Sequence, residues 1–143
     1  MTEEEVAEKL KRYIYLYQEI EILLEELERA KSYRERMTQL LSDVPKGGGS
    51  DGTMLETATE RIIEIETRIA GQVQQLTQER METDEMISSL DNQRMRMIMQ
   101  MHYISGKTWD QIADALFMDR RWVLRIRKKA IRKLTTKSHC KPL

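Results

Sequence analysis

Two long runs of apolar residues at alternating spacings of three and four constrain the fold of this chain most strongly. The first run is Val6, Leu10, Tyr13, Tyr17, Ile20, Leu24 and Leu27, and the second is Leu55, Ala58, Ile62, Ile65, Ile69, Val73 and Leu76. This spacing places one apolar stripe along a helix and is typical of a coiled-coil seam. The sequence therefore predicts two long helices, each of which must bury one face.

The segment between the two runs predicts a loop. Residues 43–53 contain Pro45 and four glycines, which a helix interior does not tolerate. A helix of about 40 residues is about 60 Å long, so we expect the two helices to fold back on each other as an antiparallel, coiled-coil-like hairpin over residues 1–82. The stripes are wide, which favours a homodimer through the hairpin. Packing of the hairpin on its own head segment is the alternative.

A third helix is expected over residues 83–104. Thr83 is its predicted N-cap, and Ser105 with Gly106 ends it. Because no Gly or Pro occurs near residues 81–83, continuity with the preceding helix stays open. The sequence thus predicts an all-α fold, with a hairpin followed by a small head segment (residues 83–136) and a tail at 137–143.

Within the head segment, residues 107–134 predict a short helix, a tight turn and a longer helix. Thr108 and Gln111 form a capping-box pattern for the first helix, and Asp119 is placed to cap the second. Helical spacing gives each helix one apolar face, which comprises Trp109, Ile112, Ala113 and Leu116 in the first and Val123, Ile126, Ala130 and Leu134 in the second. This pattern is typical of a helix-turn-helix, whose second helix enters the DNA major groove.

The opposite face of the second helix is basic. Between residues 120 and 133 there are eight Lys or Arg and no acidic residue. A solvated face that serves solubility is the plain alternative, but the short capped helix and the tight turn favour DNA binding. The candidate DNA-binding residues are Lys107, Thr108, Arg120, Arg121, Leu124, Arg125, Lys128, Lys129 and Arg132.

The distribution of charge supports the same hypothesis. The chain as a whole is neutral, with 24 basic and 24 acidic residues. Residues 91–143 hold 13 Lys or Arg and four Asp, whereas residues 1–90 hold 11 basic and 20 acidic residues. A basic end attracts phosphates, and an acidic helical end is better suited to protein contacts.

Other classes of protein find little support in the sequence. The single cysteine, Cys140, forms no intrachain disulfide, no apolar run approaches the length of a membrane span, and the acidic N-terminus is unlike a signal peptide. We therefore expect a cytoplasmic protein without membrane contact. His102 and His139 lie far apart and no catalytic or phosphate-binding motif occurs, so we expect no enzyme activity, no cofactor and no metal.

Residues 90–134 resemble region four of bacterial sigma factors. The matching positions are Tyr103, Gly106, Lys107, Thr108, Ile112, Ala113, Val123, Ile126, Ala130, Arg132, Lys133 and Leu134. The whole arrangement, with a helical front, a Gly-Ser loop and this head segment, resembles small phage and prophage transcriptional regulators related to the RinA and ArpU late-gene activators. The first resemblance covers about 45 residues closely, and the second is architectural.

The resemblance implies which residues read DNA. In sigma factors the solvent face of the second helix reads a promoter hexamer, and the matching positions are Arg120, Arg121, Leu124 and Arg125. Sigma factors often carry Glu where this chain has Arg121 and Gln where it has Arg125. Since Glu accepts from cytosine and Arg donates to guanine, a different sequence is expected to be read.

The resemblance also implies a role. It predicts a sequence-specific transcriptional regulator of phage type, a dimer or low oligomer at promoter DNA, with host RNA polymerase as a further partner. Nothing in the chain resembles the sigma-factor regions that bind the polymerase clamp or melt DNA, so a complete sigma factor is not expected. Two alternatives stay open, namely a small terminase subunit for phage DNA packaging and a polymerase-binding adaptor without DNA contact.

Overall fold

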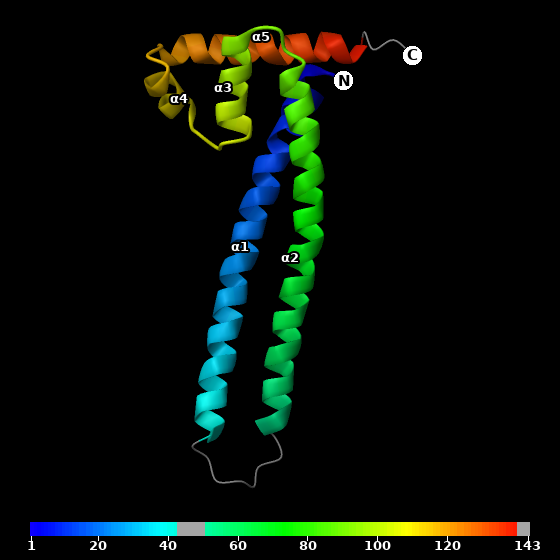
Figure 1. The fold of residues 1–143 in the computed structure, drawn as a ribbon, viewed down its shortest axis with the longest axis vertical. Coiled ribbons are helices and arrows are strands. Elements are labelled where there is room, and N and C mark those ends of the chain that lie inside the picture. Colours follow the sequence, from blue (N-terminus) through cyan, green and yellow to red (C-terminus); the bar gives the residue numbers. More distant parts are fainter. Residues whose placement is uncertain (43–50, 140–143) are drawn as a thin grey trace. The chain divides into compact units, whose positions relative to one another are not determined.

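The computed structural model describes residues 1–42 and 51–139, and these residues fold entirely into helices and connecting turns (Figure 1). The all-α prediction is therefore confirmed. The helices are α1 (Glu3–Ser42), α2 (Asp51–Ser88), α3 (Gln93–Tyr103), α4 (Trp109–Ala115) and α5 (Arg120–His139).

The chain forms two compact units. The head unit consists of residues 1–16 and 76–143, and the two-helix unit consists of residues 17–75. Helices α1 and α2 continue from one unit into the other. The head unit therefore contains residues 1–16 and 76–82, which the sequence-based division assigned to the hairpin.

The predicted start of the third helix at Thr83 is wrong. Helix α2 runs through this position to Ser88, and Thr83 is fully buried inside it. The next helix begins at Gln93, where the side chain of Asn92 caps it by accepting a hydrogen bond from the backbone N–H of Met95 at 3.0 Å. The helical spacing of apolar residues continues through residue 83 and gives no sign of a helix end there. The break between α2 and α3 is set by the turn at residues 89–92.

Two other predicted boundaries shift. Residues 51–53, expected in the loop, are already helical in α2, and the remainder of that loop, residues 43–50, lies outside the described residues. Residues 137–139, expected in the tail, continue α5, and residues 140–143 also lie outside the described residues.

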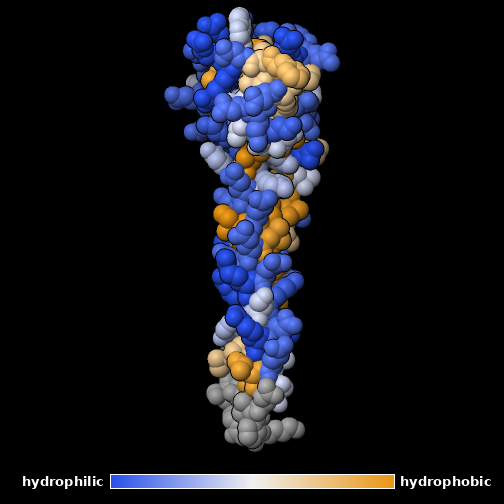
Figure 2. All heavy atoms as spheres, turned by 90° about the vertical axis from the view of Figure 1, so that its left-hand side faces the viewer, coloured by the Kyte–Doolittle hydropathy of each residue, from blue (hydrophilic) through white to orange (hydrophobic). Residues whose placement is uncertain are grey.

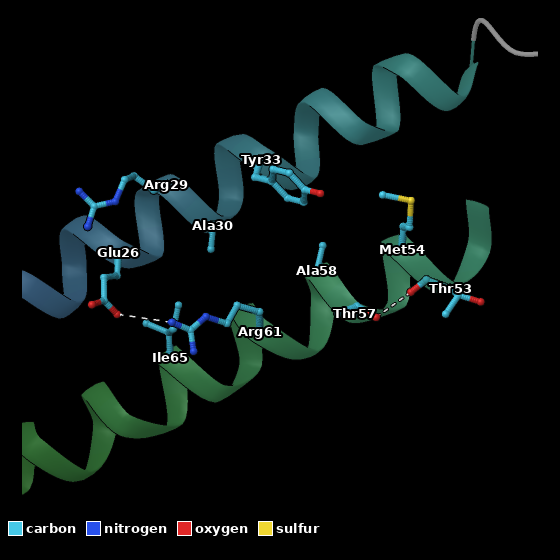
Figure 3. Close-up of a pocket in the computed structure, with 10 residues that line it drawn as sticks. All are labelled: Glu26, Arg29, Ala30, Tyr33, Thr53, Met54, Thr57, Ala58, Arg61 and Ile65. Atoms are coloured by element: carbon cyan, nitrogen blue, oxygen red, sulfur yellow. Dashed lines mark hydrogen bonds and ion pairs between the residues drawn. The ribbon is translucent and has the colours of Figure 1, made fainter. Parts of the chain in front are cut away.

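In the two-helix unit, α1 and α2 run side by side in opposite directions (Figures 1 and 3). The seam between them buries Ile20, Leu23, Ala58, Ile62 and Ile65. Two expected seam residues of α1 are on the surface instead, since Tyr17 is 48% and Leu24 is 45% exposed. The apolar stripe of α1 is wider than the surface that α2 alone can cover. Helix α2 covers the side of the stripe that carries Leu23.

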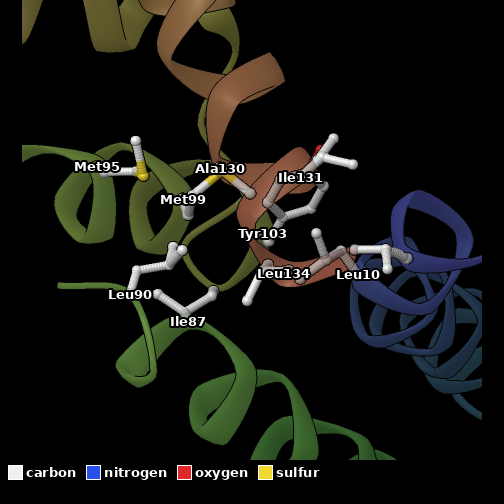
Figure 4. Close-up of a cluster of buried hydrophobic side chains, with 10 residues drawn as sticks. Leu10, Ile87, Leu90, Met95, Met99, Tyr103, Ala130, Ile131 and Leu134 are labelled. Carbon is white, nitrogen blue, oxygen red and sulfur yellow. The ribbon is translucent and has the colours of Figure 1, made fainter. Parts of the chain in front are cut away.

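The head unit is built on a core that joins residues far apart in the chain. Val6 and Leu10 of α1 and Ile87 of α2 pack with side chains of α3 and α5 around Tyr103 (Figure 4). The other buried members are Leu90, Met95, Met99, Ala130, Ile131 and Leu134. The first helix of the chain thus supplies part of the core under α5.

A second, smaller core holds α4 against α3 and α5. It consists of Ile98, Ile112, Ala113 and Val123. Trp109 and Ile126 pack against both cores, so they connect them. Because α5 contributes to each core, its orientation within the head unit is fixed along most of its length.

Polar contacts add to the packing of α1 in this unit. Lys9, whose side chain is only 13% exposed, binds the carboxylates of Glu79, at 2.8 Å, and Glu82. Burial opposes the charge on this ammonium group, but hydrogen bonds and attraction from Glu79 and Glu82 outweigh it and raise the pKa of Lys9. Lys9 therefore stays charged and links the start of α1 to the end of α2.

Candidate nucleic-acid interface

Helix α4 starts with the cap that the sequence predicted. The hydroxyl of Thr108 accepts a hydrogen bond from the N–H of Gln111 at 3.1 Å, and the N–H of Thr108 donates to Oε1 of Gln111 at 2.9 Å. The capping box is therefore confirmed. It satisfies donors that a seven-residue helix otherwise leaves unpaired.

The turn between α4 and α5 is short and tightly hydrogen bonded. The N–H of Met118 donates to the carbonyl of Ala113 at 2.9 Å, while Phe117 adopts a positive φ of 55°. Asp119 then caps α5, because its Oδ1 accepts from the N–H of Arg121 at 3.0 Å. The predicted cap at Asp119 is thus confirmed, and the direction of α5 is set from its first residue.

Helix α5 has one buried face and one exposed face. Val123, Ala130 and Leu134 are buried as expected, with Ile126 partly buried and Ile131 added to the core. The predicted DNA-binding residues on the other side are exposed, except for Leu124, which is half-buried. The exposed members are Arg120, Arg121, Arg125, Lys128, Lys129 and Arg132.

The exposed cations differ in whether an acid compensates them. Arg120 lies 3.4 Å from Asp110, Arg121 lies 3.8 Å from Asp119, and Arg132 lies 3.6 Å from Glu3. These pairs are solvent-exposed, so each contributes little to stability. Within the described residues, no carboxylate pairs with Arg125, Lys128 or Lys129, and the guanidinium of Arg125 lies over the Trp122 ring, 5.2 Å from its centroid.

Lys107 and Thr108 precede α4, and their side chains are exposed. The contact between Arg120 and Asp110 brings the first turn of α4 beside the first turn of α5. The two predicted residues therefore lie near the end of α5 that carries Arg120. The hydroxyl of Thr108 already accepts one hydrogen bond in the cap, so it retains its proton and one lone pair for a ligand.

Arg127 is a structural residue that the sequence analysis did not single out. Its Nε donates to the hydroxyl of Tyr103 at 3.0 Å, and its guanidinium lies 5.6 Å from the centroid of the Trp109 ring. Arg127 lies four residues after Val123 and therefore on the buried side of α5. This spacing was the sequence signal that could have identified it as a structural residue. Arg127 therefore fixes α5 against α3 and does not belong to the exposed basic face.

His102 completes this aromatic contact. Its ring stacks on Trp109 with centroids 3.8 Å apart, and its Nδ1–H donates to the carbonyl of Lys107 at 2.8 Å. Burial lowers the pKa of His102 despite that hydrogen bond, and the charge of Arg127 also lowers it. The imidazole of His102, in α3, is thus held neutral and packs against the first residue of α4.

In residues 1–42 and 51–139, no group of three or more His, Cys, Asp or Glu side chains is arranged to hold a metal ion. Over the same described ranges, none of the helices has both the length and the apolar character needed to cross a membrane.

Comparison with protein families gives one assignment. Residues 48–135 match the family described as "Protein of unknown function (DUF1492)". The chain belongs to the DUF1492 family. The matched region of this DUF1492 protein includes α3, α4 and α5 as far as residue 135, and hence all the candidate DNA-binding residues. Comparison with curated proteins and with solved structures gives no match.

Proposed function

We propose that this DUF1492 protein is a sequence-specific, DNA-binding transcriptional regulator of phage type. The observation that carries the proposal is the outer face of α5, where Arg125, Lys128 and Lys129 are exposed and, among the described residues, have no acidic partner. The opposite face of this helix packs into two cores. A rigid helix with uncompensated cations on its solvent side fits the major groove and its phosphates.

The proposal assigns different roles along α5. Arg121 and Arg125 lie near the N-terminal end of the helix, where side chains of a recognition helix reach base edges, and Arg donates favourably to the paired acceptors of guanine. Lys128 and Lys129 lie further along, where the helix leaves the groove and meets phosphates. Arg125 is the stronger base-reading candidate, because the charge of Arg121 is partly compensated by its ion pair with Asp119.

The proposal includes self-association and a protein partner. In the two-helix unit, Tyr17, Leu24 and Ile63 are 48%, 45% and 56% exposed, which leaves apolar surface available for a second copy of the chain. A dimer or low oligomer would present two head units to a repeated site. Contact with host RNA polymerase in the bacterial cytoplasm is proposed on the resemblance to phage regulators and sigma factors.

The test begins with selection of bound genomic fragments by the full-length protein. A shared sequence should be enriched, and its affinity should fall by roughly 10²- to 10³-fold between about 50 and 200 mM salt if about five phosphates are neutralised. Arg125→Ala should weaken the selected site by about 1 to 3 kcal/mol and random DNA much less, whereas Lys128→Ala should weaken both alike. Arg125→Lys is the matched control, since it keeps the charge but loses the paired donors.

The outcomes separate the alternatives. Equal losses on selected and random DNA for Arg125→Ala and Lys128→Ala would contradict sequence reading. No DNA binding at low salt would favour the polymerase-binding adaptor. In light scattering, a large ring would favour the small terminase subunit, and a mass of 17.0 kDa at micromolar concentration would contradict self-association.

A further inference from the structure

A second surface of the head unit lies beside the proposed DNA-reading face. It is a groove of about 780 Å³ between the start of α3, the turn after α4 and one flank of α5. Its two aromatic members are exposed, Phe117 by 96% and Trp122 by 57%. Figure 2, which faces the side where α4 lies in Figure 1, shows hydrophobic atoms among hydrophilic ones on this unit.

The groove uses a different stripe of α5 from the DNA-reading face. Its α5 members are Trp122, Ile126, Lys129 and Lys133. The DNA-reading stripe is Arg121, Arg125, Lys128 and Arg132. Both series have spacings of four, three and four, and each member of the first lies one residue from a member of the second. One residue corresponds to about 100° around a helix, so the two stripes face different directions. They meet along an edge where Arg125 lies over Trp122, and Lys129, proposed above to contact phosphates, also lines the groove.

Neither the backbone conformation nor burial accounts for an aromatic residue at position 117. It occupies the one non-glycine position with positive φ among the described residues, in the turn after α4. A bulky side chain at positive φ is unfavourable, and Asn or Gly suits such a turn better. Burial of Phe117 does not offset this cost, because its side chain is 96% exposed. Folding of the isolated chain therefore gains nothing evident from an aromatic residue here.

The floor and rim of the groove indicate what it binds. The floor is formed by Met95, Met118 and Ile126, which offer no hydrogen bonds from their side chains and suit an aliphatic or aromatic group. The rim carries Arg94, Lys129 and Lys133, and none of these three cations is paired with a carboxylate among the described residues. The one acidic lining residue, Asp119, already caps α5 and pairs with Arg121.

We infer that this groove is a docking site for an acidic amphipathic helix of a protein partner. Apolar side chains on one face of that helix would contact Phe117, Trp122 and the methionine floor, and its carboxylates would meet the three unpaired cations. This is the helix-in-groove mode of recognition, with charge complementarity at the rim. A nucleic-acid base fits less well, because the floor is apolar and the oxygen of the lining amide, Asn92, already caps α3. The inference does not depend on DNA binding.

The test uses the full-length protein and a defined probe. The probe is a fluorescent synthetic peptide of about five helical turns, with Leu and Phe on one face and Glu elsewhere, and its control is a scrambled peptide of the same composition. The amphipathic peptide should bind saturably and the scrambled one should not. On binding, the indole N–H signal of Trp122 should shift in an NMR spectrum, while that of Trp109, which lies outside the groove, should stay.

Three variants probe the groove and two serve as controls. Phe117→Asn suits the positive φ and should weaken peptide binding by about tenfold or more, as loss of an aromatic anchor does. Arg94→Glu and Lys133→Glu should each weaken it as well. Met97→Gln alters an exposed methionine outside the groove and should change nothing. Lys128→Glu, on the DNA-reading stripe, should weaken DNA binding far more than peptide binding.

Several results would overturn the inference. These are absence of saturable peptide binding, equal binding of the scrambled peptide, or an unmoved Trp122 signal. If Phe117→Asn and Arg94→Glu weaken duplex DNA as strongly as Lys128→Glu and the peptide does not bind, the flank belongs to the nucleic-acid surface. If Phe117→Asn reduces the mass of the assembly in light scattering, a second copy occupies the groove.

Discussion

The two units of this protein are built from the same two long helices but use them differently. In the head unit, α1 and α2 contribute Val6, Leu10 and Ile87 to a core that also contains α3 and α5. In the two-helix unit, each helix has only the other to pack against, and apolar residues such as Ile22 and Ile63, both 56% exposed, stay at the surface. Identical secondary structure thus supports a closed core in one unit and an open apolar surface in the other.

The pockets of the two units differ in the charges that line them. The two-helix unit has a pocket of about 570 Å³ where Ala30 of α1 faces Ala58 of α2, with Arg61 near Glu26 at its edge (Figure 3). Its charges are mixed, since Glu26 and Arg61 approach to 3.8 Å. Among the described residues, three cations on the rim of the head-unit groove lack an acidic partner, whereas this pocket has one such cation, Arg29, and we therefore propose an acidic ligand only for the groove.

The largest effect should come from a matched pair of leucines on α1. Leu10 is fully buried in the head unit, whereas Leu24 in the two-helix unit is 45% exposed. Leu10→Ala should lower the free energy of unfolding by about 3 kcal/mol, as cavity formation does in a closed core. Leu24→Ala should cost less than about 1 kcal/mol in the monomeric protein. Urea unfolding measures both, and equal losses would contradict the contrast between the units.

The two tryptophans test the difference between packed and exposed side chains within the head unit. Trp109 packs against both cores and stacks on His102, whereas Trp122 is 57% exposed. Trp109→Ala should cost about 3 kcal/mol, and Trp122→Ala should cost well under half as much. Thermal unfolding followed by circular dichroism tests this. A similar fall in melting temperature for both variants would argue against the assignment of Trp109 to the core.

A buried hydroxyl offers a gain in stability in the head unit. The Oγ1 atom of Thr83 is buried in α2 and has no hydrogen-bond partner in the part of the chain that the structure describes. Thr83→Val removes this group, keeps the branched shape, and should raise the free energy of unfolding by about 1 kcal/mol. Thr67→Val is the control, because Thr67 lies on the exposed side of the same helix and donates to the carbonyl of Ile63. Destabilisation by Thr83→Val would show that its hydroxyl has a partner.

The smallest effect concerns pH. Because burial lowers the pKa of His102 in the folded protein, the unfolded chain binds a proton more readily. The stability associated with the neutral ring is present above the ordinary imidazole pKa of about 6.5 and is lost as the pH falls below it. His102→Asn, which can still donate to the carbonyl of Lys107, should flatten the loss of stability between about pH 6.5 and 5. An unchanged slope in denaturation experiments would contradict a lowered pKa of the half-buried His102.

Much of the candidate site was predictable from the sequence because it depends on neighbours along one helix. The caps at Thr108 and Asp119 and the separation of the buried and basic faces of α5 follow from residues within four positions of each other. The roles of Phe117 and Arg127 did not follow. Phe117 is of a residue type that is usually buried, so its exposure was not expected from the sequence. The hydrogen bond from Arg127 to Tyr103 joins residues of different helices, which spacing along one helix does not reveal.

The sequence by itself determined the all-α class, the two long helices and the short capped helix before α5. Only the tertiary structure decided that Leu10 and Ile87 share a core with α5, that Leu23 is buried instead of Leu24, and that Thr83 lies inside a helix. The physical reason is that periodicity reports which side chains share a face of one helix. Which face is buried depends on contacts between residues distant in the chain, and these contacts are set by packing.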